Sequence, residues 1–273
     1  MTLADGEPAA PTLPSRPAPT SAPSSRFAAS DEGDPPPSPA LTAPAALPAA
    51  VVELFTSEGC SSCPPADQNL GALTALAERA GRRVFGLEMH VDYWDDLGWA
   101  DPFSSPVFSA RQRAYAGSFG LRGIYTPQMV VNGREEFIGS HGPRAEAAIA
   151  RALAAPPTVR VAVSATRLEG PRASIRVDYR VGPTEAVDLH LAVAIDKADT
   201  RVTGGENANR VLEHRHVVLA FETRPSTTAG SGTWLSPWPA SAKGAAAFVV
   251  AYVSDPRTLA ILGSDGTPVP AAN

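Results

Sequence analysis

The 273-residue chain is long enough for one large or two ordinary domains. Its 28 acidic and 23 basic side chains give a formal charge of −5 without a dense cluster of Lys or Arg, so nucleic-acid binding is not expected. The longest nearly continuous apolar run, residues 244–253, is about half of the roughly 20 residues that cross a bilayer, so no transmembrane helix is predicted.

The first 48 residues are rich in Pro, Ala and Ser and contain 12 of the 28 prolines. Such a segment buries too little apolar surface to offset the entropy lost on ordering, so we predict a disordered extension over residues 1–48. A signal peptide begins with a basic stretch and an apolar core, and the opening Met-Thr-Leu-Ala-Asp-Gly-Glu has neither. No signal peptide is therefore recognised.

The segment that follows alternates strands and helices. Residues 51–56 are apolar and β-branched and predict a buried strand. Pro64 and Pro65 stand where the first turn of a helix tolerates proline, and the apolar residues after them recur at helical spacing, which predicts a helix over residues 64–79. Residues 84–91 predict a second strand, parallel to the first.

Further elements complete this unit: a helix over residues 106–116, strands over 128–131 and 135–138, and an Ala-rich helix over 143–153. Asn132-Gly133 is a strong hairpin signal, so the last two strands should pair antiparallel. We therefore predict an α/β domain over residues 49–155, which ends before Pro156-Pro157.

The remainder of the chain has a different pattern. Apolar and polar residues alternate or cluster in short runs separated by Gly, Pro and Asn, at residues 159–163, 174–179, 188–193, 217–221 and 247–253. This pattern predicts an all-β antiparallel, sandwich-like domain over residues 158–270.

The only two cysteines, Cys60 and Cys63, lie between a predicted strand and a predicted helix. A thiol at a helix N-terminus ionises readily, because unpaired N–H groups and the helix dipole favour the thiolate. Cys60 is therefore a candidate nucleophile for thiol–disulfide exchange, and Cys63 the candidate resolving cysteine. Two alternatives remain open: a structural disulfide, and a metal site in which the pair supplies two soft ligands.

The order of the elements over residues 49–155 resembles the thioredoxin fold. In that superfamily a cis-proline lies beside the active-site dithiol, and the residue before it offers backbone hydrogen bonds to an extended substrate. Thr126-Pro127 matches that position, so the resemblance implies that Thr126 and Pro127 bind substrate. The expected fold class is an α/β thioredoxin-like domain followed by an all-β antiparallel sandwich-like domain.

Longer motifs resemble the DUF1223 family. They are VVELFTSEGCSSCPPA at 51–66, HVDYWD at 90–95, Leu97-Gly98-Trp99, GIYTPQMVVNG at 123–133 and GGENANR at 204–210. The resemblance covers roughly residues 50–255. Members of this family are usually bacterial, carry a thioredoxin-like domain and are predicted to be exported, and they have no agreed activity. The resemblance therefore implies a periplasmic or secreted protein without naming a substrate.

Three further residues are candidates for a role beside the cysteines. His90 and Asp92 should leave one strand end on the same face, where His90 would stabilise the Cys60 thiolate or bind a metal. The alternative is that both cap loop backbone. Glu53 is acidic in a buried strand, which is costly unless the carboxylate is paired. The thioredoxin resemblance implies that such a carboxylate takes the proton of Cys63, and pairing with an arginine is the alternative.

The expected function is thiol–disulfide exchange on a protein or peptide, with an unidentified electron-transfer partner. No cofactor is expected, because the dithiol itself holds the electrons. The sequence does not indicate whether the protein reduces or oxidises its substrate. The alternative is a non-catalytic binding module whose cysteines form a Cu or Zn site or a structural disulfide.

Overall fold

The computed structural model describes residues 47–170, 173–239, 242 and 244–271. The predicted extension lies outside the described residues except for Leu47 and Pro48. The helices are α1 (Pro64–Arg79), α2 (Pro106–Ser118) and α3 (Gly142–Ala154), with a 3-10 helix η1 at Asp92–Trp94. The strands are β1 (Ala50–Thr56), β2 (Val84–His90), β3 (Gln128–Val131), β4 (Glu135–Ile138), β5 (Val161–Leu168), β6 (Ser174–Val181), β7 (Val187–Arg201), β8 (Val211–Thr227), β9 (Gly230–Pro237), β10 (Ala247–Ser254) and β11 (Ile261–Pro268). None of the described helices is long and apolar enough to cross a membrane.

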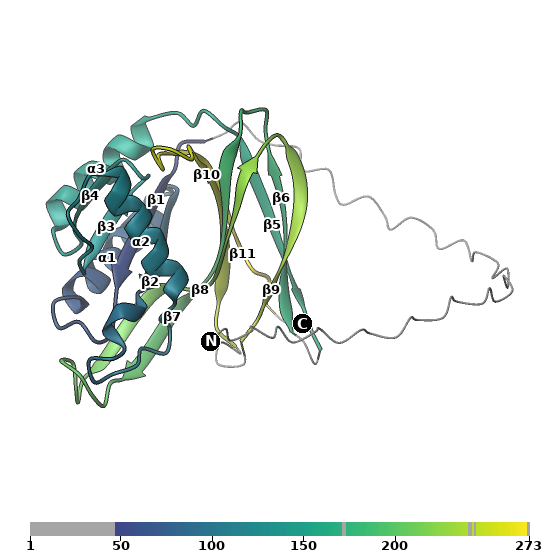
Figure 1. Cartoon of the computed structure of the whole chain (residues 1–273). Helices are drawn as coiled ribbons and strands as arrows, with labels where there is room; N and C mark the ends of the chain where they lie inside the picture. Colours follow the sequence, from purple (N-terminus) through teal and green to yellow (C-terminus); the bar gives the residue numbers. More distant parts are fainter. Residues whose placement is uncertain (1–46, 171–172, 240–241, 243, 272–273) are drawn as a thin grey trace, which may run out of the picture. The chain divides into compact units, whose positions relative to one another are not determined.

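A mixed eight-stranded sheet runs through this part of the chain in the order β11-β10-β7-β8-β2-β1-β3-β4 (Figure 1). β1 pairs parallel with β2 and antiparallel with β3. β7 pairs antiparallel with both β8 and β10. The two groups of strands join where β2 pairs parallel with β8, at Glu88 and Val217.

The predicted fold class, an α/β thioredoxin-like domain followed by an all-β sandwich-like domain, is wrong. The structure is mostly β, with three helices among the described residues, and its large sheet contains strands from both predicted domains. The two predicted domains share one sheet because β8, which begins at Val211, pairs with the edge of β2. This edge would otherwise leave backbone N–H and C=O groups of a buried strand without partners.

Helices cover both faces of the sheet around β1. Because side chains alternate along a strand, Val52 and Leu54 pack with Leu70 of α1 and Ile149 of α3. Val51 and Phe55 face the other side, where they pack with Tyr115 and Phe108 of α2 and with residues of β7 and β10. All seven residues of β1 are buried, as expected for a central strand.

A second sheet, in the order β5-β6-β9, packs on the other end of the large sheet (Figure 1). Leu189, Leu191 and Val193 of β7 point into this interface, together with Ile175 and Val177 of β6. The intervening β7 residues, including Ala192 and Ala194, face the core beneath α2. The two-residue period of β7 thus builds two different cores from one strand.

Candidate functional site

Cys60 and Cys63 form a disulfide in the loop between β1 and α1. Their Cα atoms are 5.5 Å apart, and the N–H of Cys63 donates to the carbonyl of Cys60 at 3.2 Å. Both cysteines are buried, with exposed fractions of 1% and 0%, whereas Ser61 and Ser62 between them are exposed. The loop therefore presents its serines to solvent and keeps the sulfur atoms beneath them.

Cys63 is the N-cap residue of α1, and the helix begins at Pro64, as the prolines at positions 64 and 65 predict. Proline at the first helical positions has no N–H that needs a partner there. The carbonyl of Cys63 accepts hydrogen bonds from the N–H groups of Ala66 and Asp67. The predicted placement of the cysteine pair at the helix N-terminus is thus confirmed.

The connection between β7 and β8 covers this loop. Asn207, which is fully buried, donates from Nδ2 to the carbonyls of Glu58 and Cys60, both at 2.9 Å. The N–H of Ser61 donates to Oε2 of Glu206 at 2.9 Å. A Cβ atom at Gly204 would lie 2.2 Å from the carbonyl oxygen of Gly98, so this connection requires glycine there. The β7–β8 connection therefore packs directly on the cysteine loop.

Thr126 and Pro127 directly precede β3, and the bond between them is cis. β3 runs antiparallel to β1, so this bond lies at the sheet edge from which the cysteine loop leaves. Thr126 is connected to that loop through Trp94, whose Nε1 donates to Oγ1 of Thr126 at 2.9 Å. A Cβ atom added at Gly59 would lie only 3.2 Å from the Cβ atom of Trp94, so Trp94 packs directly against the loop. That Thr126 and Pro127 contact a substrate stays a prediction.

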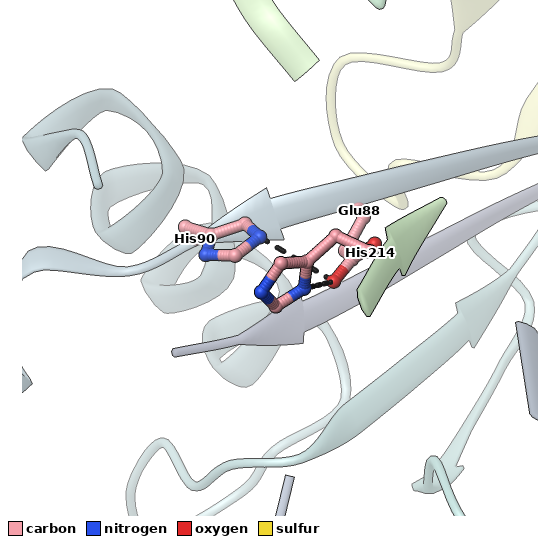
Figure 2. A group of neighbouring side chains, drawn as sticks. All are labelled: Glu88, His90 and His214. Carbon is pink, nitrogen blue, oxygen red and sulfur yellow. Dashed lines mark hydrogen bonds and ion pairs between the residues drawn. The ribbon is translucent and has the colours of Figure 1, made fainter. Parts of the chain in front are cut away.

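A cluster of charged side chains lies buried beneath the loop, built from β2, β8 and the β1–α1 loop. Oε1 of Glu88 is 2.7 Å from Nδ1 of His214 and 3.4 Å from Nε2 of His90. Figure 2 shows both imidazole rings directed at this one carboxylate oxygen. Glu88 and His90 are fully buried and His214 is 1% exposed.

Two further carboxylates hold the outer nitrogens of these rings. Nδ1 of His90 donates to Oδ2 of Asp101 at 2.7 Å. Nε2 of His214 is 3.2 Å from Oε1 of Glu58, whose other oxygen accepts from Nε1 of Trp99 at 2.7 Å. The N–H of Glu58 donates to the same Asp101 oxygen at 2.8 Å. The cluster is therefore tied to the cysteine loop through the backbone of Glu58.

Attraction between the carboxylates and the imidazole rings sets the protonation states in this cluster. Burial by itself would lower the pKa of His90, but the carboxylates of Asp101 and Glu88 hold this pKa well above its usual value. Burial likewise opposes ionisation of His214 and Glu88. The electrostatic attraction between His214 and Glu88 outweighs this effect of burial. It raises the pKa of His214 to about 9 and lowers that of Glu88 to about 2.

Asp67 lies on α1 one helical turn after Cys63, so the two side chains share a face of the helix. The hydroxyl of Thr56 donates to Oδ1 of Asp67 at 2.7 Å. Burial, reinforced by the negative charge of Glu88, raises the pKa of Asp67 to about 8. Asp67 therefore holds a proton at neutral pH on the helix face that also carries Cys63.

Glu53 lies on the face of β1 that α2 covers. Its carboxylate forms an ion pair with Arg111 and accepts hydrogen bonds from the hydroxyls of Tyr115 and Tyr252. Among the described residues, the hydrogen bonds to its side chain come from these three. The arginine pairing that was the alternative for Glu53 is thus observed.

His90 and Asp92 have different partners, although they leave the same strand. Asp92 begins η1, where its carboxylate accepts from the hydroxyl of Ser109 on α2. The N–H of Asp92 also donates to that hydroxyl, at 3.2 Å. Asp92 therefore joins the loop to α2, whereas His90 belongs to the buried cluster.

Sequence reasoning missed Glu88, Glu58, Asp67, Asp101 and His214. One available signal was Glu88, which shares a strand face with His90 in an otherwise apolar run. His214 gave no such signal, because the predicted strand began only at residue 217 and its pairing with β2 is not encoded locally.

A family model described as a protein of unknown function, DUF1223, matches residues 51–254. No curated protein matches the chain. Among solved structures, protein AGR_C_4864 from Agrobacterium tumefaciens is 29% identical with a TM-score of 0.57, and the match covers 80% of this chain and 92% of that one. HBP35 of Porphyromonas gingivalis is 17% identical with a TM-score of 0.58, covers 82% of this chain and 76% of its own, and shows similarity of fold alone. The length of the family match shows that this chain belongs to the DUF1223 family.

Proposed function

We propose that the protein exchanges thiols and disulfides with a protein or peptide substrate through Cys60 and Cys63. The observation that carries the proposal is the disulfide at the start of α1, one helical turn before a buried acid, Asp67. A sulfur atom at a helix N-terminus leaves readily as a thiolate, because the helix dipole stabilises the negative charge.

The exchange begins when a substrate thiolate attacks Sγ of Cys60. The bond between Cys60 and Cys63 breaks, a mixed disulfide forms, and Cys63 leaves as a thiolate. A second substrate thiolate then attacks the substrate sulfur of the mixed disulfide and releases Cys60 as a thiolate. Two electrons pass from substrate to protein, and the reverse sequence reduces a substrate disulfide.

Asp67 is the group that we assign to the proton in this step. Its raised pKa keeps it protonated at neutral pH, so it can donate to the Cys63 thiolate as that thiolate leaves. In the reverse direction Asp67 takes this proton back, which is the role that the thioredoxin resemblance implied for Glu53, whose carboxylate is engaged with Arg111.

Burial of both sulfur atoms means that a substrate reaches Cys60 only after the cover moves. The cover is the β7–β8 connection, which binds the loop through Glu206 and Asn207. Thr126 and Pro127 lie at the same sheet edge, where we place the substrate backbone. An extracytoplasmic location suits this chemistry, since disulfides persist in oxidising compartments.

A trapping experiment tests the roles of the two cysteines. Cys63→Ser leaves Cys60 unable to release a bound thiol, so incubation with an oxidised model peptide should accumulate a mixed disulfide at Cys60. Cys60→Ser, the matched control, should trap several times less. Equal trapping by both variants, or none by either, would contradict the proposal.

The same burial favours a second candidate, in which the disulfide is a structural bridge. Such a bridge fixes the loop that carries Glu58 and exchanges with no substrate. It predicts that neither single variant traps peptide and that loss of both cysteines destabilises the fold by about 2 kcal/mol, as expected for so short a closed loop.

A further inference from the structure

Three buried polar atoms in the cluster beneath the disulfide have no hydrogen-bond partner among the described residues. They are Oε1 of Glu58, Nε2 of His90 and Nε2 of His214. A buried polar atom without a partner usually costs about 1–3 kcal/mol, so native proteins rarely retain it without a reason. Oε1 of Glu58 and Nε2 of His214 lie 3.2 Å apart and offset each other as an ion pair. Nε2 of His90, which is 3.4 Å from Oε1 of Glu88, is therefore the buried atom that most clearly lacks a partner.

The donor atoms of Glu88, His90 and His214 all lie within 4.8 Å of one another. A tetrahedral zinc ion with bonds of about 2.0–2.2 Å holds its donor atoms roughly 3.3–3.5 Å apart. The 3.4 Å between Oε1 of Glu88 and Nε2 of His90 already has this value. The 2.7 Å between Oε1 of Glu88 and Nδ1 of His214 would lengthen by roughly 0.6–0.8 Å when an ion replaces the hydrogen bond.

The outer nitrogen of each ring faces a carboxylate, as in metal sites. His90 directs Nδ1 at Asp101, and His214 directs Nε2 at Glu58. A carboxylate behind a metal-bound histidine fixes the tautomer and orientation of the ring. Trp99 in turn holds Glu58, so the shell around the three donors is itself fixed.

We propose that Glu88, His90 and His214 bind one divalent transition-metal ion, with Zn²⁺ as the ion that their donor set fits. Two imidazole nitrogens and one carboxylate oxygen are ligands of zinc sites that keep a fourth position open. Cys60 and Cys63 are absent from this ligand set, because their sulfur atoms are joined to each other. The proposal goes beyond thiol–disulfide exchange and does not depend on it.

Metal content is measured on the full chain purified without chelator, by elemental mass spectrometry. The chain is then stripped with a chelator and titrated with Zn²⁺ against a chromophoric competitor. We expect one equivalent of metal per chain and a single tight site. Glu88→Gln and His214→Gln should each weaken Zn²⁺ binding by more than about 100-fold, and Asp101→Asn, which acts through His90, by about 10- to 100-fold.

His216→Gln is the matched control for His214→Gln. His216 is also on β8, but its Nε2 is 2.8 Å from Oγ1 of Thr74, outside the three donors. This variant should bind Zn²⁺ as the wild type does, and so should a chain with both cysteines replaced by serine. Circular dichroism identifies any variant that does not fold. If Glu88→Gln or His214→Gln does not fold, the Zn²⁺ affinity of Asp101→Asn decides the outcome.

Two outcomes would overturn the proposal. One is a wild-type chain that contains no metal and binds Zn²⁺ no more tightly than His214→Gln. The other is a bound metal that is lost when the cysteines are replaced but retained when His214 is replaced. Because the cysteine-free chain is part of the series, failure of the metal site is distinguishable from failure of thiol–disulfide exchange.

Discussion

At the residue scale, the environment of a buried side chain decides its protonation. Nη1 of Arg111 approaches Nδ1 of His190 at 3.4 Å, and arginine only donates, so Nδ1 is the acceptor. Nε2 therefore carries the proton and donates to Oγ of Ser254 at 2.9 Å. Burial and the charge of Arg111 hold the pKa of His190 well below its usual value.

Because of His190, the free energy of unfolding depends on pH. Below about pH 6.5 the unfolded chain protonates this imidazole while the folded chain does not, so stability falls as the pH falls. We expect His190→Gln to remove about 1.4 kcal/mol per pH unit from that slope between pH 6 and pH 4.5, measured by denaturant unfolding. Equal slopes in the wild type and His190→Gln would contradict this assignment.

Asp67 is tested through the pH dependence of disulfide reduction. We expect Asp67→Asn to slow reduction of the Cys60–Cys63 bond by a dithiol about 100-fold at pH 7, the lower end of the range for a general acid. In the wild type, the rate constant per reductant thiolate should fall above pH 8, where Asp67 loses its proton. Asp67→Asn should show no such fall. Glu78→Gln, on the exposed face of α1, should behave as the wild type.

At the element scale, local patterns predicted most helices and strands around the cysteines. α1 has the predicted bounds, and the Asn132-Gly133 hairpin joins β3 to β4. β7 and β8 are much longer than the runs at residues 188–193 and 217–221 predicted. Their outer halves have exposed polar residues opposite each other, so no apolar alternation marks them. His214, which bonds Glu88, lies in the part of β8 that the sequence pattern did not predict.

The β7–β8 connection is expected to control access to the disulfide. Asn207→Ala removes two hydrogen bonds to the loop backbone, worth about 1 kcal/mol each. We expect reduction of the disulfide by a small dithiol to become roughly 30-fold faster, since about 1.4 kcal/mol corresponds to a factor of ten. Thr203→Ala, at an exposed position of the same connection, is the control. An unchanged rate in Asn207→Ala would show that the connection is no barrier.

At the scale of the whole molecule, one sheet and one buried ion pair unite segments far apart in sequence. Glu53 of β1 binds Arg111 of α2 and Tyr252 of β10. Sequence reasoning recognised that Glu53 needed a partner but had no means to choose Arg111. Likewise, the pairing of β2 with β8 joins residues more than a hundred positions apart, which local propensity does not encode. The fold class was therefore mispredicted although most elements were found.

Glu53→Gln is expected to destabilise the whole fold. It leaves the guanidinium of Arg111 buried without its carboxylate, which usually costs about 3–5 kcal/mol. Glu135→Gln breaks the pair with Arg151, whose side chain is 59% exposed, and should cost at most about 1 kcal/mol. Denaturant unfolding of both variants measures the difference. Similar costs would contradict a structural role for the Glu53–Arg111 pair.

The reduction potential of the Cys60–Cys63 pair tests the proposed function most directly. Titration in glutathione buffers, with each redox state quantified by alkylation, gives this value. Thiol–disulfide exchange predicts a reversible couple between about −270 and −120 mV, and the position within that range indicates the direction of transfer. A potential below about −300 mV would contradict exchange and identify the disulfide as a structural bridge.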